Sequence, residues 1–206
     1  VGEGVKNSND PAVRYLLQKN IALDKIFIFA SKKVRGEIKG CQDEDGKPQT
    51  HLAFTLARFK EFLPDADCYS VFDYDEDGSD NDNLKFIAKM AEEVQKFAEG
   101  EEIILHVDLT GGMRHVNMMM LELTRLLEYS RMKVGKVLYS NYKGKETPGT
   151  VEEIQNVYDL FQLIAGVEEF VNFGSVKALV PYYAGRKLSE PLKKLYNSMG
   201  NFADAI

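Results

Sequence analysis

The chain has 206 residues, of which 44% are hydrophobic and 28% charged, and this composition supports a globular protein with a sizeable core. Its net charge of −6 argues against broad binding to duplex nucleic acid but leaves room for a local basic pocket that holds one small anion. Cys41 and Cys68 form no CxxC motif and no paired histidines occur, so neither a disulfide framework nor a zinc site is indicated. No apolar run approaches the length of a membrane span and no signal peptide is visible, so we expect a cytoplasmic protein without a membrane partner.

The predicted elements alternate between helix and strand along the chain. Asp10 and Pro11 are typical of a helix start, with an N-cap followed by proline, and they predict a helix to about Asn20. The run KIFIFA, residues 25–30, is short, β-branched and aromatic, which predicts a buried strand. The pattern then predicts a helix over 50–63, a strand over 68–72, a helix over 84–97, a strand over 103–107, a helix over 112–129, a strand over 136–140 and an edge strand near 154–157.

Strands that alternate with helices of ten or more residues indicate βαβ units. We therefore predict an α/β fold with a Rossmann-like, mostly parallel sheet flanked by helices. A C-terminal helical segment, broken around Gly174 and Gly185, follows the sheet. We place the sheet domain at residues 1–158 and the helical segment at residues 159–206.

The loop over residues 108–114 follows a predicted strand and opens a helix, which is where open α/β sheets bind ligands. Free backbone N–H groups and the positive end of a helix dipole suit a phosphate there. Gly111 and Gly112 permit close backbone approach, Thr110 offers a hydroxyl, and Arg114 offers a bidentate phosphate donor. The residues alone predict an anion-binding loop. The simpler alternative is a tight turn in which Thr110 caps the helix and Arg114 is solvated.

Better-known motifs do not describe this loop. The sequence has no GxxxxGK[ST] motif, so ATP hydrolysis by a P-loop is not indicated, and no GxGxxG follows the first strands. The loop is not a GxSxG nucleophile elbow either. We expect no cofactor and no metal.

The family that these residues resemble is the CARF domain, the CRISPR-associated Rossmann fold. The resemblance is carried by VDLTGGMRHVNMMMLELTRLL followed by KVGKVLYSNY, because CARF domains typically show a strand ending in Asp-x-Thr/Ser-x-Gly-x-Arg/Lys, then a long apolar helix and another strand. The opening of these domains is similar to SNDPAVRYLLQKNIALDKIFIFASKKV, and the connector that follows their sheet is similar to VYDLFQLIAGVEEFVNFGSVKALVPY.

This resemblance implies a homodimeric sensor that binds cyclic oligoadenylate, a tetra- or hexa-adenylate ring made by type III CRISPR complexes, across the dimer two-fold axis. Asp108 is expected to hold the loop through backbone hydrogen bonds rather than to contact the polyanion. By matching position, the ring would be lined by Thr110, Gly111, Gly112, Met113 and Arg114, with Ser8, Asn9 and Asp10 from the first loop. The geometry of the strand ends adds Ser31 and Lys32, after the strand over 25–30, and Asn141, after the strand over 136–140.

The alternative function is a ring nuclease that cleaves this ligand without a metal, by attack of a 2′-hydroxyl on the adjacent phosphate. Thr110 and Arg114 would hold the in-line geometry and stabilise charge, and His115 would add proton transfer. The simpler alternative for His115 is a surface or packing role.

Two departures from the family pattern bear on the domain plan. The first strand of the family should precede Ser8, where VGEGVKN is poor strand material, so either that strand is missing or the alignment of the start is wrong. A HEPN ribonuclease effector would need an Arg-x4–6-His motif, and His51, His106 and His115 do not supply it. We therefore expect a fragment that lacks its effector domain.

Four other features are expected to be structural. Residues 73–84 resemble an EF-hand loop at their first six positions only, which favours a solvated acidic loop over a calcium site. The residues 118–120, all methionine, are expected to fill gaps in the core and at a dimer interface. The basic residues 32–40 are expected to form a solvated loop, with contact to nucleotide as the alternative, and residues 43–48 a turn.

Overall fold

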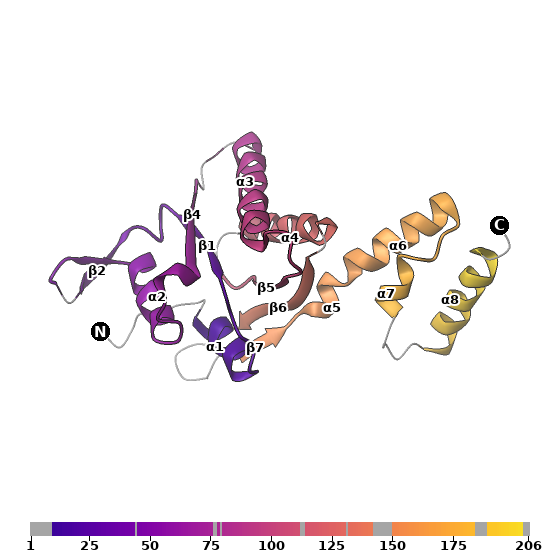
Figure 1. Cartoon of the computed structure of the whole chain (residues 1–206), viewed down its shortest axis with the longest axis horizontal. Helices are drawn as coiled ribbons and strands as arrows, with labels where there is room; N and C mark the ends of the chain where they lie inside the picture. The colour runs from indigo at the N-terminus through magenta and orange to yellow at the C-terminus, as the bar shows by residue number, and fades with distance from the viewer. Residues whose placement is uncertain are drawn as a thin grey trace. The chain divides into compact units, whose positions relative to one another are not determined.

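The protein has an α/β fold, as the sequence predicts. The structure is a computed structural model and describes residues 10–43, 45–75, 78, 80–111, 114–130, 132–141, 150–183 and 189–203. The chain divides into two compact units, Val1–Glu153 and Ile154–Ile206, and each is described by itself. The first unit contains the strands of the described residues, and the second is helical (Figure 1).

The first unit alternates helices and strands, and the predicted strands over 25–30, 68–72, 103–107 and 136–140 are confirmed as β1, β4, β5 and β6. Its elements in chain order are α1 (Asp10–Gln18), β1 (Ile26–Ser31), β2 (Glu37–Gln42), β3 (Pro48–Thr50), α2 (His51–Lys60), a 3-10 turn (Ala66–Cys68), β4 (Tyr69–Tyr74), α3 (Asp80–Ala98), β5 (Ile104–Asp108), α4 (Arg114–Tyr129), β6 (Lys133–Asn141) and β7 (Thr150–Glu153).

The strands of this unit are mostly parallel. β1 and β4 pair in parallel, with Ser31 opposite Tyr74 at their carboxyl ends. β5 and β6 also pair in parallel, with Asp108 opposite Leu138, and β7 adds to the other edge of β6 in the antiparallel direction. In the described residues, the strand ladders form a β1–β4 pair, a β2–β3 pair and a β5–β6–β7 group.

A β-hairpin of β2 and β3 occupies the region where a solvated loop was expected over residues 32–40, so that expectation is wrong for residues 37–40. The sequence pattern did not reveal β2 because its composition is polar. Ile38 is buried, whereas Glu37 and Lys39 beside it are exposed. The turn expected next is confirmed, since Asp43 Oδ1 accepts hydrogen bonds from the backbone N–H groups of Asp45 at 3.0 Å and Lys47 at 2.8 Å.

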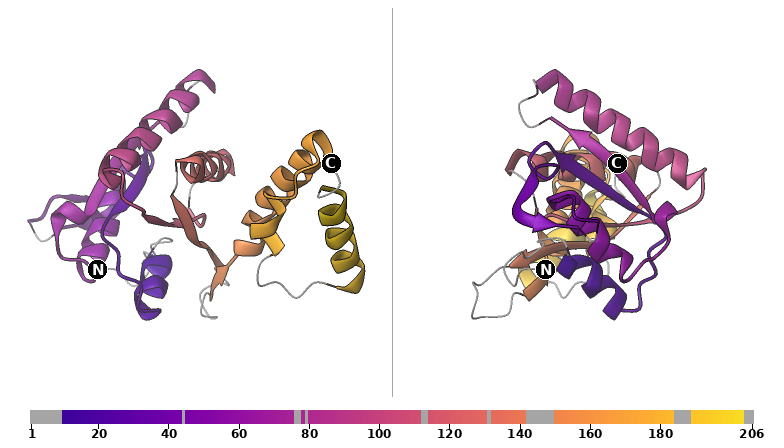
Figure 2. Two further views of the ribbon diagram at one scale, coloured as in Figure 1. Left: turned by 45° about the vertical axis from the view of Figure 1, so that its right-hand side comes forward. Right: turned by 90° about the vertical axis from the view of Figure 1, so that its left-hand side faces the viewer.

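Helices α3 and α4 cover one face of the strands and form the main core with them (Figure 2). Aromatic side chains of β1 and β4 pack against this core together with Leu105 of β5. The ring centroid of Phe29 in β1 lies 5.1 Å from that of Phe86 in α3. The buried members of the cluster are Met90, Ala91, Val94, Ala98, Leu123, Leu127 and Met132.

Helix α1 covers the opposite face. Ala12 and Leu16 of α1 pack with Leu138 of β6. Leu105 and Val107 lie two residues apart in β5, so their side chains share one face of the sheet. Val137 of β6 pairs with Val107, and Leu138 is the next residue after Val137. Leu138 therefore points away from α3 and α4, and the sheet is flanked by helices on both faces, as predicted.

His106 of β5 is packed against the backbone of β6. A Cβ atom at Gly135 would lie 2.6 Å from His106 Cε1, so only glycine leaves space for the imidazole ring. The backbone N–H of Lys136 donates a hydrogen bond to His106 Nδ1 at 3.0 Å. Burial, and secondarily the charge of Lys136, lowers the pKa of His106 below its ordinary value.

Because protonation of His106 is disfavoured in the folded state, the unfolded chain binds the proton more strongly, and the stability contributed by neutral His106 is fully present above the unfolded pKa of about 6.5. We expect this contribution to be lost as the pH falls through that value toward the lower folded pKa. The test compares melting temperatures of the wild type and His106→Asn from pH 8 to pH 5.5. The variant keeps an acceptor for the Lys136 N–H but does not titrate, so its melting temperature should fall less. Equal decreases would contradict the prediction.

The second unit consists of α5 (Gln155–Tyr158), α6 (Leu160–Phe173), α7 (Leu179–Tyr183) and α8 (Glu190–Ala203). The prediction of an edge strand near residues 154–157 is wrong, because the Val157 N–H donates a helical hydrogen bond to Ile154 O at 2.9 Å. The edge strand lies earlier in the chain and is β7. The helix break at Gly174 is confirmed, since this residue ends α6 in the left-handed region, with φ 69°. Gly185 lies outside the described residues.

No helix in the parts of the chain that the structure describes combines the length and the apolar character needed to cross a membrane.

Candidate functional site at the strand ends

The carboxyl ends of the parallel strands come together at one edge of the first unit. Tyr74 ends β4, and its hydroxyl forms a hydrogen bond with Nε2 of His115, in the first turn of α4 after β5. This contact joins the end of the β1–β4 pair to the end of the β5–β6–β7 group, so both groups present their carboxyl ends on the same side. We call this side the strand-end edge, and it is where open α/β sheets bind ligands.

The loop between β5 and α4 is fixed by Asp108 and Thr110. The Thr110 backbone N–H donates a hydrogen bond to Asp108 Oδ1 at 2.9 Å, and the Thr110 hydroxyl donates to the same oxygen. Asp108 therefore holds the loop, as expected from the sequence. The Thr110 Oγ1 also accepts a hydrogen bond from the Ser140 backbone N–H at 2.7 Å. The hydroxyl thus acts as donor and acceptor within the protein and connects the ends of β5 and β6.

Ser140 is a residue of this edge that the sequence analysis did not single out. Its Oγ is buried and has no hydrogen-bond partner among the described residues. Ser140 lies one residue before Asn141, which the sequence analysis selected for its position at a strand end. The same signal could have identified Ser140. The hydroxyl adds a polar group beside the Thr110 loop.

The rest of the predicted loop is described only in part. Gly111 follows Thr110, and Arg114 is the first residue of α4, with only its backbone described. Gly112 and Met113 lie outside the described residues, as do Ser8 and Asn9 of the first loop. Their roles stay predictions.

His115 packs against the end of β4. Its ring centroid lies 5.8 Å from that of Tyr74, which is buried and in turn contacts Phe86 of α3 at 5.3 Å. Because Nε2 is engaged with the Tyr74 hydroxyl, the geometry favours the packing role of His115 over proton transfer to a ligand.

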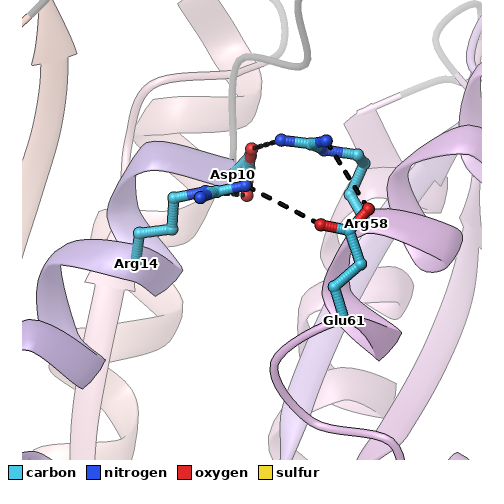
Figure 3. A network of polar contacts seen from close by, with 4 residues as sticks. All are labelled: Asp10, Arg14, Arg58 and Glu61. Carbon is cyan, nitrogen blue, oxygen red and sulfur yellow. Dashed lines mark hydrogen bonds and ion pairs between the residues drawn. The ribbon is translucent and has the colours of Figure 1, made fainter. Parts of the chain in front are cut away.

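Asp10, a predicted ligand contact, joins α1 to α2 through two arginines (Figure 3). Its carboxylate accepts hydrogen bonds from Arg14 Nε at 3.0 Å and Arg58 Nη2 at 2.9 Å. Glu61 extends the network, with one oxygen 3.5 Å from Arg58 Nη1 and the other 3.9 Å from Arg14 Nη2. The largely buried carboxylate is therefore neutralised within the protein.

Replacing Asp10 with asparagine is expected to lower the free energy of unfolding by about 1 kcal/mol, because two guanidinium groups lose the carboxylate between them while solvent screens part of the effect. Urea unfolding followed by circular dichroism measures the change. Glu61→Gln is the matched control, since Glu61 is more exposed and its contacts are longer, and it should change stability by less than about 0.5 kcal/mol. An equal loss in both variants would show that Asp10 has no special role.

Lys32 follows the end of β1, Asn141 is the last residue of β6, and both form exposed polar contacts. Lys32 Nζ lies 3.0 Å from Asp75 Oδ1, and Asn141 Nδ2 donates to Glu152 Oε1 at 3.3 Å. Ser31, the last residue of β1, lies beside Lys32. Exposed ion pairs contribute little to stability, so an anionic ligand could draw Lys32 from Asp75 at small cost.

The acidic stretch over residues 73–84, expected as a solvated loop, begins within β4 and ends within α3, and two of its aspartates pair with basic residues. Asp73 pairs with Arg35, Asp75 pairs with Lys32, and Asp80 already belongs to α3. Within the described ranges, no group of histidine, cysteine, aspartate and glutamate side chains is placed to hold a metal ion. The described side chains of the strand-end edge can contact a ligand through hydrogen bonds and charge.

These features define an α/β protein with parallel strands, helices on both faces, and a strand–loop–helix junction at the strand-end edge. No model of a known protein family and no curated protein matches the sequence.

Proposed function

We propose that this protein is a cytoplasmic, homodimeric sensor of the CARF type that binds cyclic oligoadenylate at its strand-end edge and controls an effector in type III CRISPR immunity. The observation that carries the proposal is the β5–α4 junction. Asp108, Thr110 and the Ser140 N–H form a fixed loop directly before the N-terminus of a long helix. A cyclic phosphodiester needs several donors at close range, and a helix N-terminus with glycines supplies them.

The dimer part of the proposal is supported by exposed apolar side chains on α4. Met118 is 67% exposed and Tyr129 75% exposed, and Leu126 between them is also exposed, whereas Met119 is buried in the core. The helix therefore carries an apolar surface on its outer side in addition to its core face. A second copy packed there would cover these side chains and bring two strand-end edges near one two-fold axis.

The test is calorimetric titration of the purified protein with cyclic tetra-adenylate and cyclic hexa-adenylate, with the linear forms as controls. We expect one ring bound per dimer and weaker binding of linear molecules. Absence of binding to either ring would overturn the proposal. Chromatography of the same mixtures after long incubation tests the ring-nuclease alternative, which requires a linear product.

Replacing Arg114 with alanine is expected to weaken ring binding by about 10- to 100-fold, the effect of losing a charge-assisted hydrogen bond to phosphate, with little change in melting temperature. Lys133→Ala is the matched control, because Lys133 is an exposed cation at the amino end of β6, away from the strand-end edge. It should leave the affinity unchanged. A large loss of stability in Arg114→Ala instead would assign that residue a structural role.

A further inference from the structure

Helices α5 and α6 of the second unit form one nearly continuous helix from Gln155 to Phe173. Asp159, between them, keeps a helical backbone, with φ −62° and ψ −16°. Its N–H donates to Gln155 O at 2.9 Å, and its carbonyl accepts from the Leu163 N–H at 3.2 Å. These are hydrogen bonds between residues four apart, so the helical ladder runs through Asp159. We call this element the α5–α6 helix, and its residues share one set of faces.

One face of the α5–α6 helix is already packed within the second unit. Tyr158 is buried, and a Cβ atom at Gly166 would lie 2.4 Å from Leu179 Cδ2 of α7. Figure 1 shows α7 along one side of α6. In a surface helix with one packed apolar face, the opposite face is ordinarily polar.

The outer face of the α5–α6 helix is apolar instead. Val157, Ile164 and Val171 are 62%, 54% and 73% exposed, and Leu160 and Val167 are nearly half exposed. Together the five side chains present on the order of 400 Å² of apolar surface, which is the size of patch that marks an interaction site.

The spacing of these five side chains is that of a coiled-coil seam. They follow one another at alternating steps of three and four residues, which places Val157, Ile164 and Val171 at the a positions of a heptad and Leu160 and Val167 at the d positions. Every a residue is β-branched and the first d residue is leucine, and this combination favours two parallel helices. In a two-fold pair each copy contributes the same patch, so a second α5–α6 helix fits this surface.

We infer that the outer face of the α5–α6 helix is a contact between two copies of this chain, which pair in parallel and in register along the a and d residues. Each a residue then faces the same residue of the second copy. Because α7 already holds α6 in helical form, the pair does not have to form its helices on association, which is the cost that limits short free peptides. The contact lies in the second unit and involves no ligand, so it goes beyond the proposed sensor function and stands without it.

The test is oxidative crosslinking of the ligand-free protein after Cys41 and Cys68 have been replaced with serine. In a parallel, in-register pair, Val171→Cys brings two thiols to a spacing that a disulfide spans. Asn172→Cys is the matched control, since this neighbouring residue is also exposed but lies outside the seam. We expect the Val171→Cys dimer to form at least about 10-fold faster, because pairing raises the effective concentration of its thiols. Equal rates in the two variants would overturn the inference.

A charge in the seam provides the second arm of the test. Adding Ile164→Lys to the Val171→Cys protein puts an ammonium group from each copy at the central a position, which should abolish the fast crosslinking. Ile164 is half exposed, so the helix should fold with lysine there, as circular dichroism would verify. Asn172→Lys adds the same charge outside the seam and should leave the crosslinking rate unchanged. Fast crosslinking that survives Ile164→Lys in a folded protein would overturn the seam.

The direction of the pair is tested with Val157→Cys. In the parallel arrangement Val157 and Val171 lie at opposite ends of the seam, so a mixture of Val157→Cys and Val171→Cys proteins should crosslink only within each variant. Preferential crosslinking between the two variants would show antiparallel copies and overturn the parallel pairing.

Discussion

Replacing Thr110 with valine is expected to lower the free energy of unfolding by about 2 kcal/mol, although the two side chains have nearly the same shape. The reason is the position of its hydroxyl, which donates to Asp108 and accepts the Ser140 N–H at 2.7 Å. Valine removes the acceptor of a strand-end N–H and one donor to the Asp108 carboxylate. Urea unfolding by circular dichroism measures the loss.

Thr110→Ser is the matched control because it keeps the hydroxyl and removes only a methyl group. It should cost less than about 1 kcal/mol. If serine destabilised as much as valine, the methyl group rather than the hydrogen bonds would account for the effect.

The same pair of variants separates two roles of Thr110 in ligand binding. Since the hydroxyl is engaged with both Asp108 and Ser140, we expect it to act on the proposed ring by holding the Gly111 backbone in place. We therefore expect Thr110→Val, which loosens the loop, to weaken ring binding. Thr110→Ser keeps the loop in place and should bind the ring like the wild type.

Local sequence patterns predicted the elements that carry the sheet. The apolar run of β1 and the amphipathic spacing of α3 and α4 are properties of adjacent residues, and they appear in the structure close to their predicted positions. The hairpin of β2 and β3 was missed because Ile38 is the only buried residue of its two strands. A single buried side chain shows no alternation of apolar and polar residues. The strand near 154–157 was misplaced because Ile154 and Val157 are β-branched, although their spacing of three residues fits one turn of helix rather than a strand.

The candidate site was predictable only where its contacts are local. Asp108 and Thr110 lie two residues apart, so their turn could be expected from the sequence. The partners of Thr110 and Asp10 across the fold, Ser140 and Arg58, are separated from them by 30 and 48 residues. Such contacts depend on strand register and helix packing, which the sequence pattern does not specify.

Replacing Gly166 with alanine is expected to destabilise the second unit by about 2 kcal/mol. A Cβ at this position would lie 2.4 Å from Leu179 Cδ2 and 3.0 Å from the Leu179 backbone nitrogen. Leu179 is fully buried, so its side chain has no free space to move into. The backbone contact remains even if the leucine changes rotamer. Faster amide exchange in α6 and an earlier urea transition would show the effect.

Gly200→Ala is the matched control, because Gly200 lies within α8 and a Cβ there would meet nothing within 4 Å. Alanine has a higher helix propensity than glycine and restricts the unfolded chain, so this variant should be about 0.5–1 kcal/mol more stable than the wild type. Opposite signs for the same substitution would establish that the close approach of α6 to α7 requires Gly166. If both variants gained stability, helix propensity would outweigh the contact with Leu179, and α6 and α7 would be free to separate.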